Sequence, residues 1–264
     1  MLIDSHCHLD FPDFEAGRAD VIARAQAAGV GAMVTISTRV KRFPALVKIV
    51  EAYDNVFCSV GTHPHNAAEE PGVTAAELVA LAVHPKVVAI GEAGLDYHYS
   101  EPTREAQRSS FLRHIEAARQ TLLPLVIHAR SADGDMIEIL ESETTKGKFP
   151  FILHCFSSGT ELAKVGVALG GYVSFSGILT FKTSAELRLI AGTIPHHQLL
   201  VETDAPYLAP VPFRGKTNEP AYVAHTAKVL AECVGTSVED LAQITTENAL
   251  RAFNKMPRSA LKAA

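Results

Sequence analysis

Short apolar runs rich in β-branched residues alternate along the chain with longer segments in which apolar residues recur at helical spacing. In residues 103–122, for example, Phe111, Ile115 and Ala118 recur at this spacing. The apolar runs predict eight strands, at residues 2–9, 31–37, 56–61, 87–92, 125–128, 151–155, 172–176 and 199–203. The repeat of about 28 residues is typical of one strand followed by one helix.

Eight consecutive strand–helix units favour an α/β fold of the closed (β/α)8 TIM-barrel type over an open, doubly wound sheet, although periodicity alone allows both. After the eighth run, regular structure is excluded by prolines at positions Pro206, Pro210, Pro212 and Pro220. Two extra C-terminal helices are predicted at residues 221–234 and 238–253. Ser237 and Asp240 form a capping-box pattern at the start of the second one.

Composition indicates a globular protein, since 47% of the 264 residues are hydrophobic and 20% are charged. We expect a single domain over residues 1–264, with a frayed tail at 256–264. The four cysteines are far apart and form no Cys-x-x-Cys motif, which suits a reducing compartment. We find no export signal and no apolar run of the roughly 20 residues that a membrane span needs. We therefore expect a cytoplasmic monomer with no membrane contact and no obligate protein partner.

The charge balance and the histidine content narrow the chemistry. The net charge of −5 means that the protein as a whole does not attract polyanions, so any contact with nucleic acid must be local. Twelve histidines occur against no tryptophan. Because imidazole is the commonest metal ligand, this excess directs attention to metal chemistry.

Possible metal ligands stand at the ends of several predicted strands. His6 and His8 flank Cys7 in the first strand, so strand alternation places both imidazoles on one face and the thiol on the other. Four further apolar runs end in a candidate ligand, namely Glu92, His128, His154 and the pair Glu202 and Asp204. Any one of them alone is better explained as a polar strand end that a neighbouring helix cap satisfies. Five strands with this arrangement indicate a shared site, and only a closed sheet brings the first and last strands together.

The number of candidate ligands predicts more than one ion. Four histidines and two carboxylates exceed what one tetrahedral ion needs, since a catalytic zinc typically takes three protein ligands. We therefore expect two divalent ions with the carboxylate of Glu92 as the bridge between them. Imidazole suits zinc, whereas carboxylates and water suit magnesium or manganese, so the donor set leaves the metal open.

Six segments of the chain, in order, resemble the TatD family of metal-dependent hydrolases. They are DSHCHLD at 4–10, GTHP at 61–64, GEAGLDY at 91–97, HCF at 154–156, SFSG at 174–177 and ETDAPYL at 202–208. The resemblance spans nearly the whole chain. It implies an amidohydrolase-type barrel with a divalent-metal centre and deoxyribonuclease activity.

The same resemblance implies roles for individual residues. It distributes the ligands over two ions, with His6, His8, Glu92 and Asp204 on one and Glu92, His128 and His154 on the other. It places His63 and Glu202 on the substrate side and matches residues 214–220 to a loop after the last strand. The chain departs from the family at Ala93, where relatives often carry a small polar side chain that can hydrogen-bond near the centre.

Together these observations predict a metal-dependent phosphodiesterase that acts on DNA. Asp204 is the expected proton acceptor for the attacking water, and Glu92 is expected to hold both ions. Arg130, Arg214 and Lys216 lie on predicted strand-end loops and are candidates to contact a few phosphates of one strand. Such short contact predicts exonuclease-like shortening of single-stranded or frayed DNA.

Other functions remain open at this point. Barrels of this kind host many chemistries, so a D-aminoacyl-tRNA deacylase or a small-molecule amidohydrolase fits the same ligands. A metal-storage module fits less well, because six ligands shared between two ions leave open positions. The sequence assigns no role to His65 and His98, and Asp96 and Tyr97 fit either a substrate contact or a loop cap.

Overall fold

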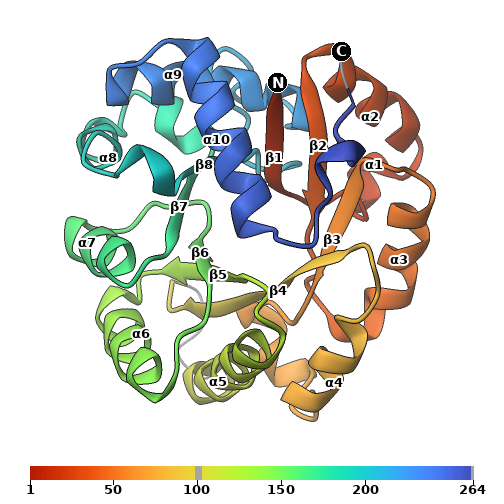
Figure 1. Ribbon diagram of the computed structural model, residues 1–264, viewed down its shortest axis with the longest axis vertical. Coiled ribbons are helices and arrows are strands. Elements are labelled where there is room, and N and C mark those ends of the chain that lie inside the picture. Colours follow the sequence, from red (N-terminus) through yellow and green to blue (C-terminus); the bar gives the residue numbers. More distant parts are fainter. Residues whose placement is uncertain (99–102, 263–264) are drawn as a thin grey trace.

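The computed structural model describes residues 1–98 and 103–262, in which eight parallel strands surround a common axis (Figure 1). Hydrogen-bonded neighbours follow chain order from the first strand to the eighth. The strands are β1 (Leu2–Cys7), β2 (Val30–Thr35), β3 (Val56–Val60), β4 (Val87–Asp96), β5 (Leu125–Arg130), β6 (Phe151–Leu153), β7 (Tyr172–Phe175) and β8 (Leu199–Val201). This is the barrel topology that the sequence predicts.

Helices surround the strands on the outside of the barrel, except that α10 lies across one end of it (Figure 1). They are α1 (Pro12–Glu15), α2 (Arg18–Ala27), α3 (Phe43–Glu51), α4 (Ala75–Leu81), α5 (Arg104–Thr121), α6 (Asp133–Lys146), α7 (Thr160–Ala168), α8 (Ala185–Ala191), α9 (Val223–Val234) and α10 (Val238–Ala252). At the start of α10, the Ser237 side chain accepts a hydrogen bond from the Asp240 amide at 3.0 Å, as its capping motif predicts. Among the described residues, none of the helices combines the length and apolar character needed to span a bilayer.

The barrel closes where the chain leaves β8 and meets β1 again. Cys7 pairs in parallel with Ala205, the Asp204 amide donates to the His6 carbonyl at 2.9 Å, and the His8 amide donates to the Ala205 carbonyl at 2.8 Å. One residue nearer the amino end of β1, the Ser5 hydroxyl donates to the Val201 carbonyl at 2.9 Å. These contacts therefore join the two segments that carry the predicted ligands of the first and the eighth strands.

Apolar side chains form separate cores on the two faces of the sheet. The larger core lies between the strands and the surrounding helices and includes Phe111 and Ile115 of α5. The smaller core gathers residues from around the ring, such as Ile3 of β1 and Val126 of β5, together with Phe253 just after α10. Because these strand residues lie near the amino ends, the C-terminal helix closes that end of the barrel. The open end is therefore the one where the strands finish.

Some boundaries differ from the sequence-based expectations. The tail that we expected to fray is packed as far as Lys262, whose amide donates to the Gly31 carbonyl at 3.1 Å, and Met256 is buried. After α10, which closes the amino end of the barrel, the chain runs against β2. Residues 263–264 lie outside the described part. β4 runs on to Asp96 rather than ending at Glu92, because its last residues continue to pair with β5.

The backbone just after β3 comes very close to β4 at Gly61 and Gly91, shortly before His63 and Glu92. A Cβ atom added at Gly61 would lie 2.4 Å from the Gly91 Cα, and Gly91 itself has a φ of +108°, which favours glycine. His63 follows Gly61 by two residues and Glu92 follows Gly91 directly. This close approach therefore sets the separation of two side chains at the open end.

We predict that Gly61→Ala lowers the free energy of unfolding by about 1–3 kcal/mol, because the added methyl group meets rigid backbone rather than a flexible side chain. Urea unfolding in the presence of a chelator measures this without a contribution from metal. Gly134→Ala in α6 is the matched control, since a Cβ there meets nothing within 4 Å. Equal stability of the Gly61→Ala and Gly134→Ala proteins would contradict this account of the β3–β4 contact.

Candidate metal centre

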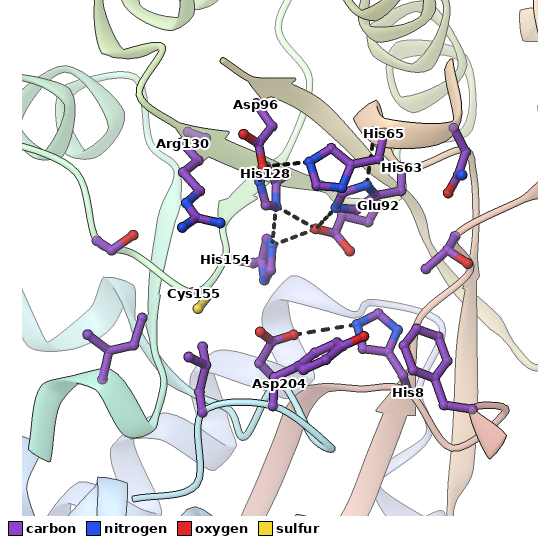
Figure 2. Close-up of a pocket in the computed structure, with 18 of the residues that line it drawn as sticks. His8, His63, His65, Glu92, Asp96, His128, Arg130, His154, Cys155 and Asp204 are labelled. Carbon is purple, nitrogen blue, oxygen red and sulfur yellow. Dashed lines mark hydrogen bonds and ion pairs between the residues drawn. The ribbon is translucent and has the colours of Figure 1, made fainter. Parts of the chain in front are cut away.

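The six predicted metal ligands converge at the open end of the barrel, and Figure 2 labels all of them except His6. They are His6 in β1, His8 directly after it, Glu92 in β4, His128 in β5, and His154 and Asp204 just after β6 and β8. Cys7, between His6 and His8, packs instead into the core between sheet and helices. The face alternation predicted for the first strand is therefore present.

One group of donor atoms, which we call the His8 cluster, consists of His6, His8 and Asp204 with the Glu92 Oε2 atom. The Nε2 atoms of His6 and His8 lie 3.3 Å apart. Asp204 Oδ1 lies 3.5 Å from the first of these nitrogens and 3.4 Å from the second. Glu92 Oε2 lies 3.5 Å from His6 Nε2.

A second group, the His128 cluster, consists of His128 and His154 with the Glu92 Oε1 atom. This oxygen lies 2.9 Å from His128 Nδ1 and 2.7 Å from His154 Nε2. The two nitrogens are 3.4 Å from each other. The two oxygens of one carboxylate therefore belong to different donor clusters.

The chemistry of this donor set fits divalent cations. Burial and the neighbouring His154 hold the pKa of His6 well below its usual value, so its imidazole is neutral and has a lone pair to offer. The buried His6 Nδ1 atom finds no hydrogen-bond partner in the described residues. Ligand atoms lying within 4.8 Å of one another occur in the sets His6–His8–Glu92, His63–Glu92–His128 and His6–His154–Glu202. Imidazole nitrogens and carboxylate oxygens at this spacing are suited to zinc and to other divalent ions.

Glu92 carries the central negative charge. Its side chain is only 2% exposed, and burial alone would raise its pKa. His154 and His63, followed by hydrogen bonds from the imidazoles around it, instead hold the pKa of this carboxyl well below its usual value. Conversely, burial would lower the pKa of His154, but Glu92 and Glu202 raise it well above the usual range. Glu92 is thus ionised and surrounded by groups that neutralise it.

The two residues expected on the substrate side take different positions. His63 lines the cavity, with Nε2 3.5 Å from Glu92 Oε1, and burial lowers its pKa to about 3. Glu202 is fully buried behind His154, to whose Nδ1 its Oε1 lies at 3.2 Å. Glu202 is also absent from the described residues that line the cavity. Glu202 therefore contacts the predicted metal ligand His154 and does not border the cavity in this structure.

Asp96 binds the ring nitrogen of His128 that does not face Glu92. The sequence did not assign this role to Asp96. Its Oδ2 accepts hydrogen bonds from His128 Nε2 at 3.1 Å and from His65 Nε2 at 2.9 Å, while Oδ1 accepts from the His98 amide at 2.9 Å. With a proton on Nε2 held by Asp96, the His128 Nδ1 atom could give up its hydrogen bond to Glu92 and offer its lone pair to an ion. Glu92 and Asp96 are four residues apart on one strand and share a face, a signal that became visible only once β4 extended to Asp96.

A cavity of about 770 Å³ opens onto the two clusters. Among the predicted phosphate contacts, Arg130 lines it, whereas Arg214 and Lys216 are not among the described lining residues. The Arg214 guanidinium instead lies 3.7 Å from the centre of the Phe181 ring. Arg39, which sequence reasoning missed, also lines the cavity and pairs with Glu69 at 2.8 Å. Arg39 follows the end of β2, and no pattern in the sequence distinguished it.

We predict that Asp96→Ala weakens metal binding about 10- to 100-fold, because His128 loses the acceptor that orients its ring. Competition with a fluorescent chelator measures the affinity directly and needs no substrate. His65→Gln is the matched control, since it removes the other imidazole from the same oxygen and leaves the His128 contact in place. Equal losses in the two variants would show that Asp96 acts on the site as a whole and not through His128.

Comparison with known proteins agrees with this geometry. A family model described as TatD related DNase matches residues 3–254. The chain is 43% identical over 258 residues to YcfH of Escherichia coli K12, an uncharacterized metal-dependent hydrolase, and the match covers 96% of both chains. It is 32% identical over 259 residues to the 3'-5' ssDNA/RNA exonuclease TatD of Escherichia fergusonii, covering 96% of this chain and 98% of the relative.

Solved structures show the same architecture. The TatD homologue YjjV of Escherichia coli superposes with a TM-score of 0.89 at 30% identity, covering 96% of this chain and 98% of the other. A TatD family hydrolase from Entamoeba histolytica, at 21% identity, has the same fold with a TM-score of 0.84 and covers 95% and 97% of the two chains. With the family model matching nearly the whole chain and the donor clusters in place, this protein belongs to the TatD family of metal-dependent hydrolases.

Proposed function

We propose that this TatD family hydrolase is a deoxyribonuclease that shortens single-stranded or frayed DNA with the help of two divalent ions. The observation that carries the proposal is the division of the Glu92 carboxylate, with one oxygen in each donor cluster, at the base of an open cavity. Two ions a few ångströms apart suit an in-line displacement at phosphorus, where both the attacking and the leaving oxygen carry charge. The relative from Escherichia fergusonii, a 3'-5' ssDNA/RNA exonuclease, supports the same chemistry.

The residues divide the work between holding ions and handling the water proton. His6, His8 and Asp204 would hold one ion and His128 and His154 the other, with one Glu92 oxygen available to each. Ions in these positions would supply Lewis-acid stabilisation of the phosphate charge and lower the pKa of water. The Asp204 side chain is 15% exposed, against 2% for Glu92, so it can meet a water molecule in the cavity and accept its proton.

Phosphates outside the centre would meet cationic side chains on the surrounding loops. Arg130 is the nearest candidate, because it lines the cavity two residues after His128. Arg214 and Lys216 lie on an exposed loop after Asp204, outside the described cavity lining, so we expect them to contact the strand beyond the cavity. The few cations near the centre suit a short grip on one strand rather than a long contact along duplex DNA.

A direct test compares substrates of three chemical classes with magnesium, manganese and zinc in turn. We expect a short single-stranded DNA to be shortened, and an aminoacyl ester and a dihydro-cyclic amide to be hydrolysed far more slowly. The products are separated by denaturing gel for DNA and by chromatography for the small molecules. Turnover of the ester or the amide without cleavage of DNA would overturn the proposal and favour a deacylase or an amidohydrolase.

We predict that Glu92→Gln lowers metal content to below two equivalents per chain, because the amide has one neutral acceptor oxygen in place of two charged ones. Elemental analysis after dialysis measures the stoichiometry. Glu247→Gln is the control for a charge change far from the centre, since Glu247 lies on α10 and pairs with Arg258. Full occupancy of the Glu92→Gln protein together with full activity would remove Glu92 from the bridging position.

We predict that Asp204→Asn folds normally but turns over DNA about 100-fold more slowly or worse, as expected for the loss of general-base assistance. Single-turnover cleavage at rising metal concentration separates this role from metal binding. If the proton role is correct, the rate stays low when the centre is saturated. Complete recovery of activity at high metal concentration would show that Asp204 serves only as a ligand.

A further inference from the structure

Two aromatic side chains stand at the edge of the cavity next to the His8 cluster. Phe11 lies three residues after His8, and Tyr207 lies three residues after Asp204. The Phe11 ring stacks on the His8 ring with centroids 4.6 Å apart, and the Tyr207 ring meets Phe11 edge-on at 6.0 Å. Both aromatic residues line the cavity. The segments that supply two predicted ligands therefore also supply an aromatic wall beside them.

Tyr207 presents its ring to solvent although its backbone is held firmly. The residue is 55% exposed, more than any other phenylalanine or tyrosine in the described part of the chain. Its amide donates to the Asp204 carbonyl at 2.9 Å. Its carbonyl accepts a hydrogen bond at 2.6 Å from the buried side chain of Asn218, which also bonds to the Thr203 carbonyl. The loop is thus fixed at a position that leaves the ring uncovered.

The cavity has a different character on the side of the His128 cluster. Arg130 lines it there, and in Figure 2 this side chain lies across the cavity from His8 and Asp204. A ligand that spans the opening would meet an aromatic surface on one side and a guanidinium group on the other. A nucleotide strand has this pairing of properties, because each unit joins a flat aromatic base to a charged phosphate.

We propose that Phe11 and Tyr207, which we call the aromatic shelf, form a nucleobase subsite that stacks the base next to the phosphate held at the metal centre. This inference rests on the proposed nuclease function and specifies how the substrate is recognised. Stacking on a shelf needs a base with a free face, so the subsite selects single strands and frayed ends over paired duplex. Because every base has such a face, we expect the shelf to tolerate all four bases.

The test uses two sets of single-stranded oligonucleotides that differ only in whether one base is present. An abasic tetrahydrofuran unit replaces the terminal or the penultimate nucleoside, at the 3' end in one series and at the 5' end in the other. This change removes the ring and keeps the phosphates. At the end that the enzyme attacks, we expect loss of the stacked base to lower kcat/KM about 5- to 150-fold, the range for one base–aromatic stack.

Variants then assign the effect to the shelf. In Tyr207→Ala and in the Phe11→Ala/Tyr207→Ala double variant, we expect the intact and abasic oligonucleotides to be cleaved at nearly equal rates. Tyr207→Phe keeps the ring and should keep the preference for the intact strand. Leu189→Ala is the control for loss of an exposed apolar side chain, since Leu189 is 75% exposed on α8, away from the cavity lining. Quenching of 2-aminopurine at the same base position reports stacking without cleavage.

The outcomes separate this inference from the function on which it rests. If the wild-type protein cleaves neither oligonucleotide with any ion, the nuclease proposal fails and the nucleobase subsite falls with it. If it cleaves intact and abasic strands equally, the nuclease proposal stands and the subsite is wrong. A base preference that survives in the double variant would also overturn the subsite, because the base would then be recognised elsewhere.

Discussion

The buried charge of Glu92 is the constraint on which the site depends. A carboxylate this well enclosed is costly unless cations or hydrogen-bond donors surround it. Here the imidazoles of His63, His128 and His154 approach one oxygen and His6 approaches the other. Divalent ions would replace this neutralisation with a stronger one. The strands that carry these residues must therefore end at one place.

Closure of the sheet meets this requirement with backbone hydrogen bonds. The contacts from Asp204 to His6 and from His8 to Ala205 join the two ends of the strand order at the open end of the barrel. They also fix the separation of ligands that lie about two hundred residues apart in the chain. Between β3 and β4, the close approach of Gly61 to Gly91 likewise sets the positions of His63 and Glu92.

The interior apolar core and the candidate metal ligands lie at opposite ends of the barrel. Apolar residues fill the interior near the amino ends of the strands, and α10 with Phe253 closes that end. The candidate metal ligands lie at the opposite end, where loops can vary without disturbing the core. The aromatic shelf and the cationic side of the cavity both belong to such loops and strand ends, which is where substrate preference would be set.

The sequence by itself determined the repeating strand–helix pattern and the positions of six ligand candidates at strand ends, because strand periodicity and strand-end positions are local properties. Periodicity alone allowed an open sheet as well as a barrel, and the shared strand-end ligands and the family motifs favoured the barrel. The role of Asp96 needed the full extent of β4, which depends on pairing with β5 rather than on any local signal. Only the tertiary structure showed that Glu202 lies behind His154, that the residues after α10 pack beneath β2, and that Arg39 and the aromatic shelf border the cavity. These are contacts between segments remote in the chain, and the packing of the closed barrel, not the local pattern of residues, decides them.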